Sequence, residues 1–241
     1  MRASNHGELG LIVLSSCKEL GGLVDERILQ LRAEEDDDKS YLVPIEEVRF
    51  SNGEGKIKLL DSVRGKDIYI FCDVGNYSCE YTMFGRSHCM GPDEHFQDIK
   101  RVLSAIGGKA DRVTVIMPLL YASRQHKRKG RASLDCAMAL KELENLGVHA
   151  ILTFDVHDPT IHNAIPGTSF ENIFPTYSML KCFIANEGAN IKKDNMTVIS
   201  PDTGAMDRAI YYANTLGVDV GMFYKRRDHT AVSYTHLTLP T

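Results

Sequence analysis

This chain repeats one order of segments, a short apolar strand, a polar loop and an amphipathic helix, and few folds accommodate that order. Strands are expected at Leu9–Leu14, Asp67–Cys72, Val113–Met117, Val148–Phe154, Met196–Ser200 and Val218–Tyr224. Helical patterns lie between them, at 20–31, 92–106, 133–146, 175–186 and 205–216. Strands that alternate with helices form a parallel sheet with helices on both faces, so we expect an α/β protein with doubly wound domains.

The layout occurs twice, with a junction near Phe170 to Pro175. A chain of 241 residues is long enough for two domains, and we expect them at 1–172 and 173–231. Within the first domain, residues 75–91 show no clear periodicity and are expected to form a long loop, which in a compact domain is often functional.

Three of the helices carry apolar residues at helical spacing, and Ser133 is expected to cap the third of them. The faces expected to be buried are Leu20, Val24, Ile28 and Leu31, then Phe96, Ile99, Leu103 and Ile106, then Cys136, Leu140 and Leu143.

A basic segment follows the strand at Val113–Met117, once Pro118 has ended its hydrogen-bond ladder. Five of the eight residues from Arg124 to Arg131 are Lys or Arg, and Gln125 and His126 lie among them. Ligands of open α/β sheets bind beyond the carboxyl ends of strands, and guanidinium and ammonium groups donate charge-assisted hydrogen bonds to phosphate. The segment therefore fits a polyphosphate; a solvated basic loop is the alternative.

A hairpin is expected between Val48 and Leu59, because Asn52-Gly53 between alternating apolar residues favours a type I′ turn. Phe50 and Glu54 flank its tip and are not needed for the turn. An aromatic ring and a carboxylate could stack on a base and accept from its amino group. A purely structural hairpin is the alternative.

Polar residues also follow two other strands. Asp155 and His157 are two residues apart, so in an extended backbone they would point the same way and could hold Mg²⁺ or its water shell. The alternative is that they satisfy a turn. Asp202 or Thr203 can cap the helix that begins near Ala205, and no P-loop ending follows.

The charge and hydropathy of the chain argue against several classes of protein. The formal net charge of −4 argues against a nucleic-acid-binding protein, and no apolar run is long enough to cross a membrane. The N-terminus lacks the apolar centre of a signal peptide. The acidic run 34–38 is expected to be a solvated loop.

The six cysteines lack a Cys-x-x-Cys pair and are expected to be mostly buried free thiols in a reducing cytoplasm. Zinc binding by Cys79, His88, Cys89 and His95 is an alternative whose spacing matches no common module.

Several segments together resemble the ribose-phosphate diphosphokinase (phosphoribosyl pyrophosphate synthetase) family. They occur in the family's order: Arg49-Phe-Ser-Asn-Gly-Glu54, Ser62-Val-Arg-Gly-Lys-Asp67, Tyr121-Ala-Ser-Arg-Gln-His-Lys-Arg-Lys129, Phe154-Asp-Val-His157, Ser200-Pro-Asp-Thr-Gly204 and Lys225-Arg-Arg227. The resemblance implies two phosphoribosyltransferase-like domains and an enzyme that transfers the β,γ-diphosphoryl group of MgATP to the C1 hydroxyl of ribose 5-phosphate, releasing AMP.

The resemblance also implies roles for individual residues. Phe50, Asn52 and Glu54 would form an adenine pocket lent by a neighbouring subunit, in a homo-oligomer that is a hexamer built from dimers. ATP would be held by Arg124 and Gln125. His157 and Asp202 would contact Mg²⁺ or its waters, and Lys225 and Arg227 would neutralise charge on the transferring group.

The chain departs from the family pattern at several places. His126 replaces an Asp, one residue is inserted before Arg124, Asp158 stands where Ala is usual, Ala205 where Gly is usual, and 75–91 is longer than usual. No Asp-Asp-x-x-x-[Thr/Ser]-Gly loop for ribose 5-phosphate follows Arg227, and 232–241 resembles no part of the family.

We therefore expect an incomplete second domain and a non-native tail at 232–241. The expected activity is weak ATP binding with little turnover; a kcat above about 1 s⁻¹ would contradict this.

Three other functions remain open on the sequence. A non-catalytic regulatory relative is the first. A phosphoribosyltransferase would require the acidic loop and leaves the Phe50–Glu54 hairpin unexplained. A nucleic-acid-binding module on the basic segment is disfavoured by the net charge.

Overall fold

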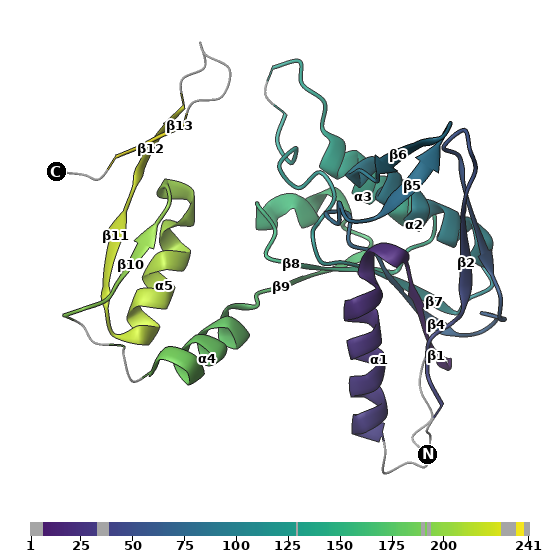
Figure 1. Ribbon diagram of the computed structural model, residues 1–241, viewed down its shortest axis with the longest axis horizontal. Helices are drawn as coiled ribbons and strands as arrows, with labels where there is room; N and C mark the ends of the chain where they lie inside the picture. Colours follow the sequence, from purple (N-terminus) through teal and green to yellow (C-terminus); the bar gives the residue numbers. More distant parts are fainter. Residues whose placement is uncertain are drawn as a thin grey trace. The chain divides into compact units, whose positions relative to one another are not determined.

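The structure is a computed structural model that describes residues 7–32, 39–128, 130–188, 191, 194–227 and 235–238 (Figure 1). The acidic run 34–38 and Lys129 of the basic segment lie outside these residues. The chain divides into two compact units, Met1–Phe174 and Pro175–Thr241. No described helix is long and apolar enough to cross a membrane.

The first unit contains a five-stranded sheet in the order β1-β4-β7-β8-β9, and every neighbouring pair is parallel. Its strands are β1 (Leu9–Val13), β4 (Asp67–Phe71), β7 (Arg112–Met117), β8 (Ala150–Phe154) and β9 (Ser169–Ile173). The α/β class with a parallel sheet is confirmed. β9 was missed because this edge strand is polar and half exposed, and it lies where the sequence predicted only a junction.

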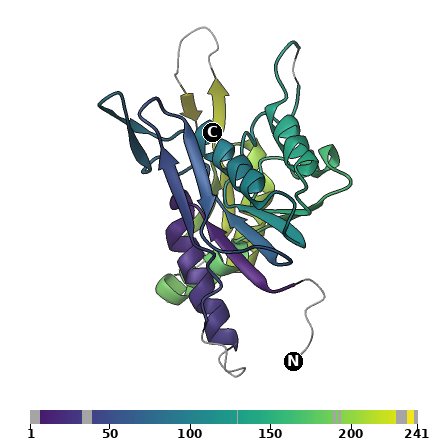
Figure 2. The same ribbon diagram turned by 90° about the vertical axis from the view of Figure 1, so that its right-hand side faces the viewer.

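Helices cover both faces of this sheet, as in a doubly wound fold (Figures 1 and 2). α2 (Pro92–Ile106) and α3 (Asp135–Asn145) pack on the face formed by residues such as Ile70 and Val115, and α1 (Lys18–Arg32) packs on the face of Leu11 and Phe71. The predicted stripes of α2 and α3 are buried.

Two helix predictions were wrong in detail. Leu31 is 67% exposed, because it lies outside the apolar cluster of Leu11 and Phe71 that the earlier residues of α1 pack against. Ser133 does not cap α3; its hydroxyl donates to the Asp135 carboxylate, and Leu134 occupies the cap position.

Two antiparallel hairpins project from the sheet, β2 (Ile45–Arg49) with β3 (Gly55–Leu59) and β5 (Glu80–Met83) with β6 (Arg86–Cys89) (Figure 1). The second hairpin corrects the prediction of an irregular loop at 75–91. The type I′ turn in the first was also wrong. Only Gly53 has a positive φ (90°), and its N–H donates to the Phe50 carbonyl, which gives a three-residue loop.

The cysteines are all free thiols, but only half of them are buried. Burial raises the pKa of Cys17 to about 12 and the pKa of Cys136 to about 11, so these thiols are inert. Cys72 is also buried, whereas Cys89 and Cys182 are exposed.

The second unit is built from two helices and two pairs of strands in the residues that the structure describes. It contains α4 (Thr176–Glu187), a parallel pair formed by β10 (Thr197–Ser200) and β11 (Asp219–Met222), and α5 (Met206–Leu216), which packs on that pair. β12 (Tyr224–Arg227) pairs antiparallel with β13 (Thr235–Thr238). The strand predicted at Val218–Tyr224 is therefore two strands, β11 and β12.

Candidate functional site

The basic segment and the Asp155–Asp158 segment leave the sheet at the same edge. β7 ends at Met117 before Pro118, β8 ends at Phe154, and these two strands are parallel neighbours. The segments that follow them therefore meet at the carboxyl edge, where α/β sheets bind ligands.

Asp158 joins the two segments. Its Oδ2 accepts from Lys127 Nζ at 2.6 Å and lies 3.2 Å from His126 Nε2, while its Oδ1 accepts from the backbone N–H and hydroxyl of Thr160. The hydrogen bond from Lys127 and those from Thr160 hold the pKa of Asp158 far below its usual range. The carboxylate is thus ionised at neutral pH.

His126 lies between two acceptors. Its Nδ1 is 3.1 Å from the Ser123 carbonyl oxygen and its Nε2 faces Asp158, so the ring can donate to both only as an imidazolium. It also meets the His157 ring edge-on, with ring centroids 5.1 Å apart. One predicted site residue, His157, is in this way brought beside the basic segment.

Tyr121 anchors the start of the basic segment on α2. Its hydroxyl donates to Asp93 Oδ1 at 2.7 Å and its ring stacks on Phe96 with centroids 4.4 Å apart. Burial, and then the hydrogen bond to Asp93, raise the pKa of Tyr121 to about 12. The hydroxyl therefore stays protonated and the anchor persists throughout the neutral range.

The predicted ATP-gripping residues Arg124 and Gln125 are exposed in the turn that follows. Ala122 adopts a left-handed φ of 52°, and its carbonyl accepts from the Gln125 N–H at 2.8 Å. Arg124 makes no ion pair with any residue that the structure describes. Its guanidinium is therefore available to an anion.

The expected convergence of Asp155 and His157 rested on an extended backbone, and this premise was wrong. Asp155 has a φ of 50°, which breaks the two-residue alternation, and His157 is exposed. Within the described ranges, no three His, Cys, Asp or Glu side chains form a group that could hold a metal, so the zinc alternative is also unsupported.

Phe50, Asn52 and Glu54 lie at the exposed tip of the β2–β3 hairpin, where Phe50 is 47% exposed. Asn52 Oδ1 accepts from the Glu54 N–H at 3.1 Å.

The remaining predicted residues belong to the second unit. Asp202 Oδ1 accepts from the Gly204 N–H at 3.0 Å and caps the 3-10 turn that leads into α5. Lys225 and Arg227 lie in β12, opposite Leu237 and Thr235 of β13, and their side chains lie outside what the structure describes.

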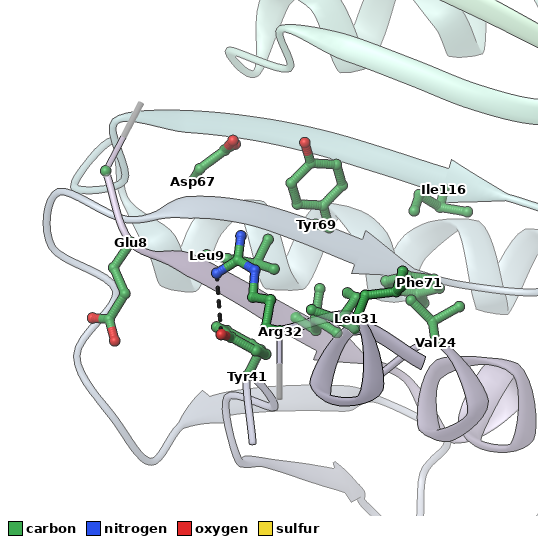
Figure 3. A pocket seen from close by; sticks show the side chains of 13 residues that line it. Glu8, Leu9, Val24, Leu31, Arg32, Tyr41, Asp67, Tyr69, Phe71 and Ile116 are labelled. Atoms are coloured by element: carbon green, nitrogen blue, oxygen red, sulfur yellow. Dashed lines mark hydrogen bonds between the residues drawn. The ribbon is translucent and has the colours of Figure 1, made fainter. Parts of the chain in front are cut away.

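A separate groove of about 590 Å³ runs between α1 and the sheet (Figure 3). Leu11, Phe71 and Ile116 form its apolar floor, and at one end Arg32 donates to the Tyr41 hydroxyl at 3.1 Å. It contains none of the residues predicted to act on ATP.

A model of the family described as the N-terminal domain of ribose phosphate pyrophosphokinase matches residues 9–147, more than half of the chain. The chain belongs to this family. The match includes the β2–β3 hairpin, the basic segment and the helices on both faces of the sheet.

Ribose-phosphate pyrophosphokinases from two bacteria are among the relatives. The protein from Ralstonia nicotianae is 27% identical over 191 residues, 77% of this chain and 53% of the relative. The protein from Vibrio parahaemolyticus is 29% identical over 189 residues, 77% of this chain and 54% of the relative. The chain therefore spans about half the length of the curated relatives it matches.

A solved structure shares the fold. The crystal structure of phosphoribosylpyrophosphate synthetase from Mycobacterium smegmatis superposes with a TM-score of 0.71 at 21% identity, covering 96% of this chain and 67% of that chain. At this identity the likeness establishes the architecture alone.

The sequence did not reveal the link from Asp158 to His126 and Lys127. Its one signal was that His126 and Asp158 both depart from the ribose phosphate pyrophosphokinase pattern. The structure shows these two residues in contact, with His126 Nε2 3.2 Å from Asp158 Oδ2.

Proposed function

We propose that this chain provides the nucleotide-binding part of a ribose-phosphate diphosphokinase. In the proposed reaction the C1 hydroxyl oxygen of ribose 5-phosphate attacks the β-phosphorus of ATP, the bond between this phosphorus and the α,β-bridging oxygen breaks, and AMP leaves. The family match over 9–147 carries the proposal. The meeting of the basic segment with the post-β8 segment at the carboxyl edge supports it.

Each predicted residue keeps a proposed role in this reaction. Arg124 and Gln125 hold the phosphates of ATP, since both are exposed donors at the carboxyl edge. The tip of Phe50, Asn52 and Glu54 holds adenine. For Lys225 and Arg227 we propose neutralisation of charge on the diphosphoryl group.

Mg²⁺ is the proposed metal, and His157 and Asp202 suit it as ligands of its bound waters. His157 is an exposed imidazole and Asp202 a partly exposed carboxylate, and Mg²⁺ prefers oxygen and keeps several waters. Each side chain would therefore contact a Mg²⁺ ion mainly through the water shell of that ion. When bound with ATP, Mg²⁺ would offset charge on the phosphates.

The proposal extends to partners and compartment. ATP and ribose 5-phosphate are the substrates, and the assembly is a hexamer built from dimers in which a neighbouring copy completes the adenine pocket. The six free thiols support a reducing, cytoplasmic location.

Calorimetric titration with MgATP tests the nucleotide site. We expect saturable binding that Arg124→Ala weakens about tenfold, because charge-assisted hydrogen bonds to phosphate are lost. Arg27→Ala, which removes an exposed arginine of α1, is the matched control and should bind like the parent. Equal affinities for the two variants would contradict the assignment of Arg124.

Product identity tests the reaction independently of its rate. With ribose 5-phosphate present, ³¹P NMR should show AMP and phosphoribosyl pyrophosphate in equal amounts. ADP with orthophosphate, or AMP formed without ribose 5-phosphate, would overturn the proposed reaction while leaving nucleotide binding intact.

A further inference from the structure

Phe84 occupies a backbone position that a bulky side chain rarely takes. Phe84 and Gly85 form the turn between β5 and β6, whose last paired residues are Met83 and Arg86. The φ values of Phe84 and Gly85 are 47° and 78°. Two positive φ values define a type I′ turn, whose first position normally holds Asn, Asp or Gly. Phenylalanine there is unfavourable for the fold.

Packing does not explain this residue. Phe84 is 77% exposed, more than any other large apolar side chain in the described part of the chain. Neither the unfavourable backbone conformation nor the solvent-exposed ring of Phe84 contributes to the stability of the fold. Such outliers gather at binding sites, where the exposed group is itself used.

The turn of Phe84 is attached to the tip of the neighbouring hairpin. The Phe84 N–H donates to the Ser51 carbonyl at 2.9 Å, next to Phe50. A Cβ on Gly53 would lie 2.9 Å from Met83 Sδ, so the two turns are in close contact. Arg49 adds a cation–π contact over the Tyr81 ring at 5.6 Å.

Two exposed aromatic rings are thereby held at adjoining tips. Phe50 is 47% exposed and Phe84 77%, and among the described side chains neither ring stacks on another. The Glu54 carboxylate is exposed on the same tip. Ring faces stack on a nucleobase whatever its identity, and a carboxylate accepts from an exocyclic amino group.

We propose that Phe84 is a second aromatic contact for the base of the nucleotide bound at the Phe50–Glu54 tip, presented there by the β5–β6 hairpin. The inference rests on the proposed function, because it requires a nucleotide at this tip. It assigns to residues 75–91 a part in base recognition.

The test compares two ligands, MgATP and magnesium tripolyphosphate, which carries phosphates without a base. Phe84→Asn is the decisive variant, because Asn favours the type I′ turn while removing the ring. We expect its melting temperature to equal or exceed that of the parent, its affinity for MgATP to fall about five- to twentyfold, and its affinity for tripolyphosphate to stay within twofold.

Three further variants sharpen the comparison. Phe84→Tyr keeps the ring and should retain the MgATP affinity, whereas Phe84→Leu keeps an apolar side chain without a ring and should lose it. Tyr77→Asn removes an aromatic that is 63% exposed in the same segment, and it should bind both ligands like the parent.

The outcomes separate this inference from the proposed function. If the parent binds MgATP and Phe84→Asn binds it equally well, the role of Phe84 is overturned and the proposed function stands. Loss of both ligands by Phe84→Asn would show a structural effect and would also overturn the role. A parent that binds neither ligand would overturn the proposed function, and the role of Phe84 with it.

Discussion

At the scale of single residues, Asp158 is the group through which the basic segment and the post-β8 segment hold each other. One oxygen accepts from Lys127 and lies 3.2 Å from His126 Nε2, and the other accepts from Thr160. Arg124 and Gln125 are one to three residues from these partners, so their position depends on a contact that neither of them makes.

Replacement of Asp158 by Ala is expected to weaken MgATP and magnesium tripolyphosphate alike, by about three- to fivefold, because the loop that carries Arg124 loses its tie to β8. Titration calorimetry measures both affinities. The pKa of Asp158 is lowered, principally by the hydrogen bond from Lys127, so the carboxylate stays ionised and its pairing with Lys127 persists from about pH 6 to pH 8.

Glu26→Ala provides the control for this variant, since it removes one exposed carboxylate from α1 without touching either segment. A double variant, His126→Asp with Asp158→Ala, replaces the linked pair by the residues that the family resemblance implies at these positions. Recovery of at least half of the lost affinity is expected. Selective loss of MgATP binding, with tripolyphosphate unaffected, would contradict a role in positioning the phosphate-binding loop.

The residue scale also shows where sequence reasoning failed. The run of cations from Arg124 is visible in the sequence, because charge needs no fold to be recognised. The partnership of His126 with Asp158 joins residues 32 positions apart and requires the register of β7 and β8. The left-handed Asp155 was unpredictable because this conformation is rare outside glycine.

At the scale of elements, the β2–β3 hairpin is fixed to α2 by a buried carboxylate. Asp98 of α2 pairs with Arg49 at the end of β2 and with Arg101 Nη1 at 2.6 Å, and its side chain is only 8% exposed. The Asp98 carboxylate thus pairs with two guanidinium groups where little water reaches them.

Removing this carboxylate should destabilise the protein strongly. Asp98→Ala is expected to lower the free energy of unfolding by about 3 kcal/mol, since two partly buried guanidinium groups lose their partner. Urea denaturation measures the change. Glu142→Ala breaks the exposed pair between Lys100 of the same helix and Glu142 of α3, and should cost less than about 1 kcal/mol. Similar losses from the two variants would refute the special role of Asp98.

Some helices and strands were easier to predict from the sequence than others. The buried strands and α2 were predictable because apolar periodicity fixes which face is covered. The β5–β6 hairpin has little apolar alternation and an unusual turn residue, and it forms against the neighbouring hairpin through Ser51 and Arg49. A hairpin held by such tertiary contacts leaves little local signal.

At the scale of the whole molecule, the alternation of strands and helices was enough to predict the fold class, because few arrangements bury that pattern. It did not predict β9, whose pairing with β8 completes the sheet of the first unit. An edge strand such as β9 is stabilised by its hydrogen bonds to the neighbouring strand. Its own sequence therefore gives little indication that it is a strand.

The first unit carries its own hydrophobic core. Both clusters of buried apolar side chains in the described residues, one beneath α2 and α3 and one beneath α1, are built from residues of Met1–Phe174.

A fragment of residues 1–174 is therefore expected to fold alone, with one cooperative thermal transition within about 5 °C of the main transition of the full chain. Calorimetry and circular dichroism measure both. Because the basic segment, the Asp158 link and both hairpins all lie within this fragment, it should also keep its affinity for tripolyphosphate. A fragment that melts without cooperativity would show that the sheet requires residues beyond Phe174, and the two units would then be one folding domain.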